Sequence, residues 1–458
     1  MGIEKNEKYP HNDIGIAQLY YDLHCGTICY VIESKSWYIY TGKRWAKDEC
    51  GLRVMEMCKA FVIALVVHAK SIDDGGDESK AYIKYVSSFH SRRKREGLLS
   101  DAKSIMPKSL AHFDSDRYLF NCQNGTLNLQ NFALQPHRAE DFTTKIAGVK
   151  YDYAAQCPRW DKFINEIMCD DVDTAAFLQM ALGYALTGDT SLECFFIFYG
   201  NTTRNGKSTL SETVAHIMGD YARTIQPQTR SRRSPDGASA SPDIARLKGA
   251  RIVNMPEPER GLELNIALIK QLTGGDTYTG RFLNENPVEF RPEFKIFMNT
   301  NHLPRTADDT VFTSGRVNLI PFDRHFTAAE QDTGLKKHFR RGVNKSAILN
   351  WLVDGYRPML EVGLSVPQRV EDAIAAYRSE VDVFGTFLAE TTVESEGCRL
   401  ATSLLYSHYQ QWVKDNGYRA MSSKTFVSEL RRRCDVRRDG ATGNVAVGLG
   451  IAVNYDAA

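Results

Sequence analysis

The clearest chemical pattern in the chain lies near its middle. An apolar run from Cys194 to Tyr199 leads into a loop that ends in Gly206-Lys207-Ser208, and a helical pattern follows. This order of strand, loop and helix places backbone N–H groups at a helix N-terminus, where they can surround phosphate groups. A lysine beside them reaches the β and γ phosphates of a nucleotide, and the serine hydroxyl can ligate Mg²⁺. We therefore predict that this loop binds ATP with Mg²⁺.

The spacing of the loop departs from the usual motif. Five residues separate Gly200 from Gly206, whereas the common pattern has four. The alternative is a chance Gly-Lys-Ser sequence in a surface turn, and the flanking strand and helix argue against it. The residues expected to bind the nucleotide are Gly200, Thr203, Arg204, Asn205, Gly206, Lys207, Ser208 and Thr209.

An ATPase also needs an acidic residue at the end of a neighbouring strand. The run Ile252 to Met255 is followed by Glu257 and Glu259, either of which could polarise water, and we expect Glu257 to join Ser208 in binding Mg²⁺. Which glutamate is the catalytic base stays open. The alternative is an exposed, proline-rich turn.

Two further polar residues lie beside later strands. Asn301 follows the strand Lys295 to Asn299, where its amide could sense the γ-phosphate and orient water. Arg316 directly precedes the run that starts at Val317, where an arginine can stabilise the charge of a transferring phosphate in the same subunit or from a neighbour. An asparagine after a strand is also common for structural reasons alone.

The elements that hold these residues follow from the apolar pattern. Between about 194 and 322 the apolar runs are short and continuous, as expected for strands buried on both faces of a largely parallel sheet. These runs are Cys194 to Tyr199, Arg251 to Met255, Phe294 to Met298 and Val317 to Phe322. The stretch from Gln226 to Pro242 is rich in Ser, Arg, Pro and Gly, which predicts a mobile loop. The turn pair Asn124-Gly125 predicts a hairpin.

Composition is that of a globular protein. The 458 residues are 43% hydrophobic and carry a net charge of +1, so the whole molecule casts no strong field toward nucleic acid. The longest apolar run, Ala60 to Val67, is too short to span a bilayer, and no apolar signal segment begins the chain. We expect no membrane association and a location in the cytoplasm, the compartment where the chain is made. The ten cysteines lack C-x-x-C spacing, so we expect reduced thiols and no structural metal.

Basic charge is concentrated near the C-terminus. Residues 399–438 contain nine Lys or Arg and three Asp or Glu. Ser422 and Ser423 offer N-caps to a basic helix from Lys424 to Arg433, and the Asp439-Gly440 turn would join two strands into a wing. Lys424, Arg431 and Arg432 are the candidates for contact with duplex DNA. The alternative is a solvated helix face.

Several motifs in order resemble those of the superfamily III helicases. They are the loop 200–209, the acidic pair, the stretch 269–276 with Arg281, and Met298 to Pro304. The similarity is greatest to the helicase portion of phage and plasmid primase-helicases related to the poxvirus replicative primase-helicase. It spans roughly residues 110 to 450 and includes 124–129, 157–160 and 182–189.

The resemblance implies an α/β protein with a P-loop core of AAA+ type, which assembles as a homo-oligomer, expected to be a hexamer. Lys207 and Ser208 would bind Mg-ATP, Glu257 and Glu259 would form the acidic motif, and Asn301 would be the sensor. Arg316 would act on the site of the neighbouring subunit. Expected domains are an N-terminal α+β domain (1–189), the ATPase core (190–326), a helical lid (327–382) and a winged-helix-like domain (383–458).

The resemblance also implies movement on single-stranded DNA and unwinding of duplex DNA. The segment 276–294 resembles a hairpin that projects into the ring, with Lys270 and Arg281 as candidates for contact with the phosphate backbone. A structural pair between Arg281 and Asp276 is the alternative. Only about 110 residues precede the resemblance, so we expect no primase activity and a separate primase or polymerase as partner.

Two other classes of function compete with a helicase. One is a DNA-binding replication initiator whose ATP site only controls assembly. The other is a small-molecule P-loop kinase, which the asparagine after a strand and the basic C-terminal region disfavour.

Overall fold

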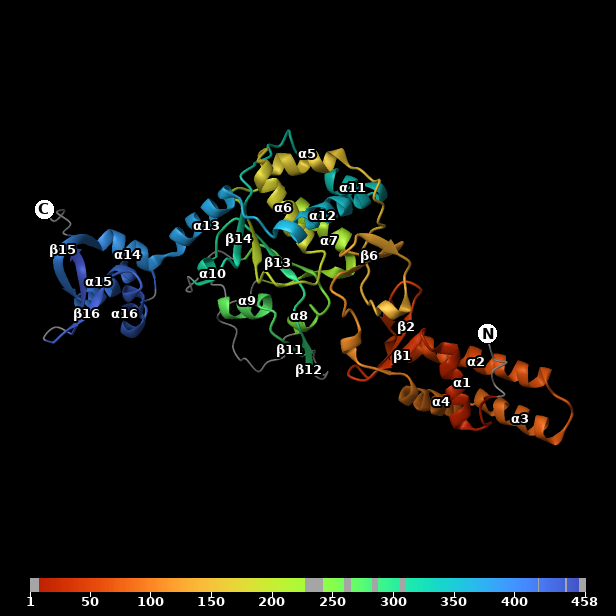
Figure 1. Cartoon of the computed structure of the whole chain (residues 1–458). Helices are drawn as coiled ribbons and strands as arrows, with labels where there is room; N and C mark the ends of the chain where they lie inside the picture. The colour runs from red at the N-terminus through yellow and green to blue at the C-terminus, as the bar shows by residue number, and fades with distance from the viewer. Residues whose placement is uncertain are drawn as a thin grey trace. The chain divides into compact units, whose positions relative to one another are not determined.

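The computed structural model describes residues 8–226, 242–258, 265–281, 287–304, 310–418, 420–440 and 443–452. The chain divides into two compact units, residues 1–373 and 374–458 (Figure 1). The boundaries expected at 189/190 and 326/327 both fall inside the first unit. Residues 227–241, nearly all of the loop expected between Gln226 and Pro242, lie outside the described residues, as does Glu259.

A five-stranded parallel sheet forms the centre of the first unit. Its strand order is β14-β8-β13-β10-β9, and every neighbouring pair is parallel. The strands are β8 Phe195–Tyr199, β9 Ala222–Thr224, β10 Ile252–Met255, β13 Lys295–Thr300 and β14 Val317–Pro321. Both faces of β8 and β14 are buried, which explains their continuous apolar sequences and confirms the predicted parallel sheet. The sequence reading missed β9, a three-residue edge strand of Ala, Arg and Thr.

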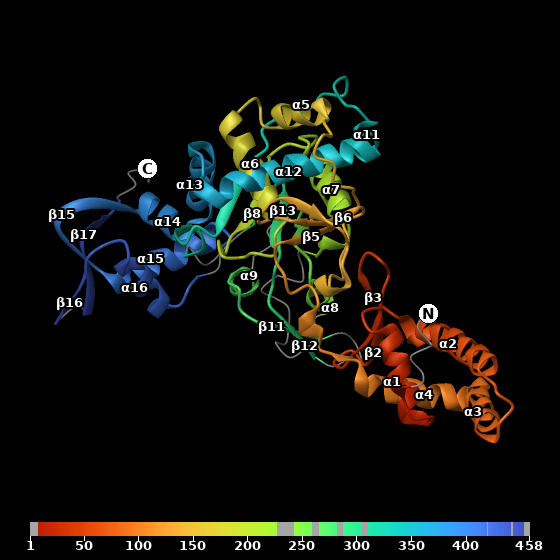
Figure 2. The same cartoon turned by 45° about the vertical axis from the view of Figure 1, so that its right-hand side comes forward.

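Helices cover this sheet on both sides. Helices α5, α6, α11 and α12 gather on one side, and α8, α9 and the hairpin β11–β12 lie on the other (Figures 1 and 2). The helices are α5 Pro158–Ile167, α6 Val172–Tyr184, α7 Lys207–Met218, α8 Pro242–Ala245, α9 Ile266–Thr273, α10 Thr310–Thr313, α11 Leu335–Phe339, α12 Gly342–Val362 and α13 Gln368–Val381. The strands of the hairpin are β11 Tyr278–Arg281 and β12 Pro287–Phe290.

Glycine lets two of these helices approach closely. A Cβ at Gly355 of α12 would lie 2.3 Å from the Gln179 carbonyl oxygen of α6, and one at Gly183 of α6 would lie 2.5 Å from the backbone nitrogen of Tyr356. Residues with side chains would therefore force α6 and α12 apart. The close packing of these helices fixes the layer above the sheet.

The N-terminal part of the first unit combines helices with two small sheets. One sheet has the order β3-β2-β1-β4, and the other is the antiparallel set β5-β6-β7. The elements are α1 Asp13–His24, β1 Ile28–Val31, β2 Ser36–Tyr40, β3 Trp45–Lys47, α2 Leu52–Ser71, α3 Asp77–Ser87, α4 Arg92–Ile105, β4 Pro107–Lys108, β5 Leu119–Cys122, β6 Gly125–Asn128 and β7 Ala133–Gln135. The predicted hairpin at Asn124-Gly125 is confirmed as β5–β6.

Two buried cations join the base of the central sheet to segments that precede it. Lys295 at the start of β13 donates hydrogen bonds to the carbonyl oxygens of Thr187 (2.6 Å) and Asp189 (2.7 Å). Arg251, directly before β10, donates to the carbonyl oxygens of Leu186 (2.6 Å) and Leu119 (2.7 Å). Burial lowers the pKa of Lys295 to about 7. Buried donors of the sheet, after position 190, are thus satisfied by backbone acceptors that come before position 190 in the chain.

The second unit contains a three-stranded sheet packed on helices. Its elements are α14 Val383–Thr391, β15 Thr392–Ala401, α15 Thr402–Asp415, α16 Ser423–Arg431, β16 Val436–Asp439 and β17 Gly443–Ile451, with sheet order β15-β17-β16. The core gathers Phe384, Phe387, Tyr409, Phe426 and Leu430. Ser422 caps α16 by accepting a hydrogen bond from the backbone nitrogen of Thr425, as predicted. The sequence reading missed β15 because it is mostly exposed, with only Leu400 buried.

Across the described ranges, none of the helices combines the length and the apolar character needed to cross a membrane.

Candidate functional site

The predicted nucleotide-binding residues meet at the carboxyl edge of the central sheet. Parallel register aligns Thr300 of β13 with Tyr199 of β8, and Met255 of β10 with Met298 of β13. The loop 200–206, Asn301 and Glu257 all follow these strand ends. In a parallel sheet this edge is where ligands bind.

Two glycines set the shape of the loop between β8 and α7. Gly206 caps α7 with a φ of 88°, in the left-handed region that favours glycine. A Cβ there would lie 2.4 Å from Cγ2 of Ile167, so α5 packs directly beneath the loop. A Cβ at Gly200 would lie 2.5 Å from the carbonyl oxygen of Phe322. The loop with five residues between its glycines therefore still delivers Lys207 to the first position of α7.

Lys207 lies at the centre of the site. Its side chain is only 6% exposed, and its ammonium donates to Oδ1 of Asn301 (2.6 Å) and to the carbonyl oxygen of Gly200 (3.2 Å). Burial lowers the pKa of Lys207 to about 8, although the negative charge of Glu257 acts in the opposite direction. The lysine is thus held by acceptors that a phosphate group could replace.

Asn301 connects Lys207 to Glu257. Its backbone nitrogen and its Nδ2 donate to the two carboxylate oxygens of Glu257, each at 3.1 Å. The amide therefore accepts from the lysine and donates to the glutamate at the same time. Three residues predicted from separate parts of the sequence lie in one hydrogen-bonded chain.

The residues present fit Mg²⁺ bound together with phosphate. Mg²⁺ takes oxygen ligands and is usually held by one or two protein groups plus substrate phosphates. Ser208 is exposed in the first turn of α7, and the carboxylate of Glu257 is exposed at the same sheet edge. Thr203 and Arg204 are also exposed, Thr209 is partly buried, and Asn205 is buried with its Nδ2 donating to the carbonyl oxygen of Thr202 (2.7 Å).

A segment that the sequence reading missed holds the outer side of this loop. Nδ1 of His325 lies 2.8 Å from the carbonyl oxygen of Thr203, and the backbone nitrogen of Phe326 donates to the carbonyl oxygen of Arg204 (2.9 Å). Because a carbonyl oxygen only accepts, Nδ1 of His325 carries the proton. These residues follow β14 in the chain, and no motif marks them in the sequence.

Arg316 does not join this chain of residues within one subunit. It precedes β14 and lies level with the start of β8. It is therefore at the amino ends of the strands, about 17 Å along the strands from the loop at their carboxyl ends. Its guanidinium pairs with the Glu193 carboxylate and donates to Oγ1 of Thr273 (3.1 Å). The side chain is 17% exposed. Its action on a neighbouring subunit stays a prediction.

The predicted DNA-binding residues fall in two places. Lys270 lies in α9, and Arg281 ends strand β11 of the antiparallel hairpin with β12, although its side chain lies outside what the structure describes. Lys424 and Arg431 are exposed on α16, and Arg432 pairs with Glu429 at 2.8 Å while remaining 62% exposed.

Comparison with known proteins adds a family relation to this α/β fold with a parallel central sheet. A model of proteins described as D5 N terminal like matches residues 17–169, and a model described as Poxvirus D5 protein-like matches residues 379–436. A protein of Acanthamoeba polyphaga mimivirus named "Putative helicase" is 25% identical over 423 residues, which cover 85% of this chain and 44% of that protein. The chain is related to the D5-type primase-helicase family.

Other viral proteins match in the same way. A "Putative helicase" of Frog virus 3 (isolate Goorha) is 26% identical over 273 residues, covering 56% of this chain and 28% of that protein. The chain spans half or less of the length of the curated relatives it matches. Among solved structures, the A form apo structure of the NrS-1 C terminal region aligns with a TM-score of 0.48 and 10% identity, covering 96% of this chain and 100% of that one.

Proposed function

We propose that the protein is an ATP-dependent replicative DNA helicase of a virus, phage or similar mobile element. It hydrolyses Mg-ATP at the interfaces of a ring-shaped homo-oligomer, moves along single-stranded DNA and unwinds duplex DNA. The observation that carries this proposal is the chain Lys207–Asn301–Glu257 at the carboxyl edge of a parallel sheet. The family relation and the names of the viral relatives support the choice of DNA as substrate.

Each group at the sheet edge has a defined task in this proposal. Backbone N–H groups of the loop and the Lys207 ammonium bind the phosphates, and Ser208 with Glu257 holds the metal ion. Mg²⁺ supplies neutralisation of the charge that develops on the phosphate oxygens. Asn301 orients the attacking water, and because it bonds both Lys207 and Glu257 it couples their positions.

DNA contact is assigned to the hairpin β11–β12 and to the second unit. The order α14, β15, α15, α16, β16, β17 is consistent with a winged-helix module, in which α16 would meet duplex DNA and β16–β17 would form the wing. Exposed Lys424 and Arg431 on α16 give the helix the charge for phosphate contact.

Strand displacement measured beside ATP hydrolysis tests the proposal. A helicase hydrolyses ATP faster when single-stranded DNA is added and separates a forked duplex only with ATP. A replication initiator would bind DNA and ATP without separating strands. A small-molecule kinase would hydrolyse ATP at a rate that DNA leaves unchanged, and either result would overturn the helicase assignment.

A further inference from the structure

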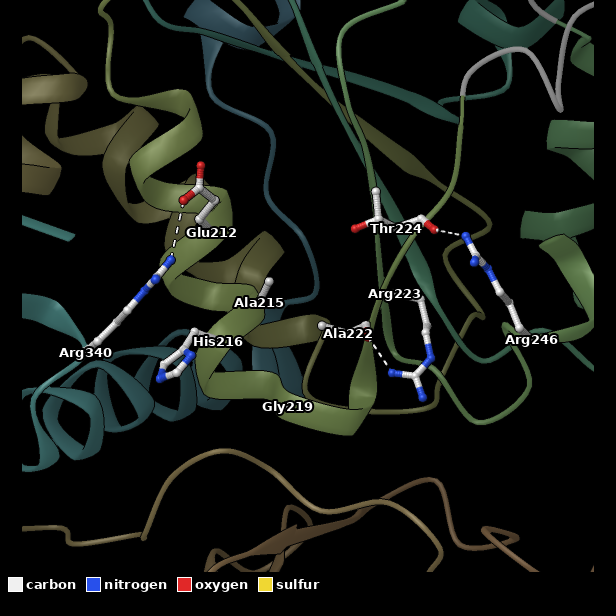
Figure 3. A pocket seen from close by; sticks show the side chains of 9 residues that line it. All are labelled: Glu212, Ala215, His216, Gly219, Ala222, Arg223, Thr224, Arg246 and Arg340. Atoms are coloured by element: carbon white, nitrogen blue, oxygen red, sulfur yellow. Dashed lines mark hydrogen bonds and ion pairs between the residues drawn. The ribbon is translucent and has the colours of Figure 1, made fainter. Parts of the chain in front are cut away.

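A hollow of the first unit lies beside the C-terminal half of α7 (Figure 3). It has a volume of about 580 Å³ and is formed by the C-terminal half of α7, strand β9, Arg246 after α8, and Arg340 at the end of α11. Its lining residues are Glu212, Ala215, His216, Gly219, Ala222, Arg223, Thr224, Arg246 and Arg340. His216 follows Lys207 by nine residues in α7, which places it about 14 Å further along the helix.

The lining carries an excess of positive charge. The lining contains three arginines, Arg223, Arg246 and Arg340, and one glutamate, Glu212. Glu212 is already shared, because it pairs with Lys336 at 2.7 Å as well as with Arg340 at 3.4 Å. The positive surroundings also act on His216, whose pKa is lowered by burial and by the charges of Lys345 and Arg340.

Backbone contacts position two of the guanidinium groups and leave donors available. Arg223 donates to the carbonyl oxygen of Ala222 and Arg246 to that of Thr224, both at 2.8 Å. A guanidinium has five N–H donors, and these are the hydrogen bonds that the two side chains make among the described residues. The ion pair of Arg246 with Asp243 is long, at 3.7 Å, and about half exposed, so solvent screens it strongly.

The side chains of the lining are better suited to contact phosphate groups than to contact the bases of a nucleic acid. The planar guanidinium group of arginine can donate two parallel hydrogen bonds to two oxygens of one phosphate group. Apart from the His216 ring, the described residues of the lining include no aromatic side chain on which a base could stack. The volume lies within the range of about 300–1,000 Å³ for small-ligand sites, which is enough for a segment of one strand.

We propose that this hollow binds the phosphodiester backbone of single-stranded DNA, independently of base sequence. This inference rests on the proposed function, because it takes DNA as the polyanion. The hollow would add a second contact for the strand, separate from both the hairpin β11–β12 and α16.

The test is a titration of the full chain with fluorescein-labelled oligothymidylate, followed by anisotropy at several salt concentrations. The triple variant Arg223→Gln, Arg246→Gln, Arg340→Gln is expected to bind at least tenfold more weakly at low salt. Its slope of log K against log salt should be shallower by about 2, because each lost phosphate contact on a single strand removes about 0.7. Thermal melting of each variant confirms that it folds.

Two single variants serve as matched controls. Glu212→Gln removes the one negative side chain of the lining and is expected to tighten binding of the oligonucleotide. Arg92→Gln removes an 84% exposed cation of α4 that pairs with Glu96, and is expected to leave affinity and slope unchanged.

Unchanged affinity and salt slope in a folded triple variant would overturn the assignment. A variant that loses binding of tripolyphosphate but keeps binding of the oligonucleotide would assign the hollow to a free anion, and one that loses only duplex binding would exclude a single strand.

DNA-independent ATP hydrolysis by the triple variant should equal that of the natural chain. If the natural chain hydrolyses no ATP, the proposed function fails, while the oligonucleotide titration still decides the role of the hollow.

Discussion

Among single residues, Lys207 combines burial with a position at the centre of a hydrogen-bonded chain. Its ammonium contacts Gly200 and Asn301, and through Asn301 it is connected to Glu257. The sequence predicted these three side chains because each follows a recognisable strand or motif. His325 and Phe326 could not be predicted in the same way, since their contacts are with backbone carbonyl oxygens of the loop, and their position depends on where β14 ends.

We expect Lys207→Ala to abolish ATP hydrolysis while the protein stays folded, because the substitution removes the charge that faces phosphate. Hydrolysis at saturating ATP and the melting temperature are the two measurements. Lys162→Ala, which removes a 70% exposed cation of α5, is the control and should keep full activity. Hydrolysis by the Lys207 variant at saturating ATP would remove this loop from the mechanism.

The pKa of Lys207 predicts how ATP binding depends on pH. A value of about 8, below the ordinary 10.5, means that half of the Lys207 side chains have lost their proton at about pH 8. Bound phosphate favours the charged form, so ATP affinity should fall by up to tenfold per pH unit above about 8 and stay level below it. Titration of a fluorescent ATP analogue from pH 7 to 9.5 measures this. Lys207→Arg, which does not titrate in this range, should bind with a pH-independent affinity; a level profile for the natural chain would refute the assignment.

At the scale of elements, the contact between α6 and α12 leaves no room for an added side chain. Gly355→Ala would place a Cβ 2.3 Å from the Gln179 carbonyl oxygen, so the helices must separate. We expect the free energy of unfolding to fall by about 1–3 kcal/mol. Chemical denaturation monitored by circular dichroism measures the change.

Gly342→Ala on the same helix is the matched control for this substitution. A Cβ at Gly342 meets no atom within 4 Å. Alanine is also the better helix former, so this variant should not lower stability. Equal effects of the two substitutions would show that helix propensity, rather than the approach of α6, decides the result.

The strands differ in how clearly the amino-acid sequence predicts them. Strands β8, β10, β13 and β14 are buried on both faces and therefore read as continuous apolar runs. The edge strand β9 and the mostly exposed β15 carry no such run, because pairing with a neighbour rather than burial defines them. Sequence patterns thus identify strands that are buried on both faces, the edge strand β14 included, and miss strands that are short or mostly exposed.

For the whole molecule, a ring mechanism predicts complementation between two inactive proteins. Arg316 lies far from its own loop, so Arg316→Ala and Lys207→Ala would damage different halves of one subunit interface. Loss of an arginine finger typically costs about 10³ or more in rate. Mixing the two variants should restore part of the ATP hydrolysis, in proportion to protein concentration. No recovery despite demonstrated subunit exchange, or full activity of Arg316→Ala, would leave Arg316 a structural partner of Glu193.

The two-unit organisation predicts separable activities. Removal of residues 383–458 deletes the basic α16 but none of the residues at the sheet edge, so basal ATP hydrolysis should persist while DNA binding weakens. Binding of a forked duplex titrated against salt measures the second effect. Unchanged affinity and salt slope after truncation would show that the basic helix is only a solvated surface.

The buried Arg251 and Lys295 at the base of the central sheet limit where recombination can join this chain to another sequence. Arg251 and Lys295 are buried, and their hydrogen-bond acceptors are backbone carbonyl oxygens of residues 119, 186, 187 and 189. A recombination event that joined residues 190–326 to a foreign upstream sequence would leave these charges without acceptors unless the new backbone followed the same path. Each loss would cost about 1–3 kcal/mol or more. The phosphate loop and the segment before it are therefore expected to pass between genomes as a single piece.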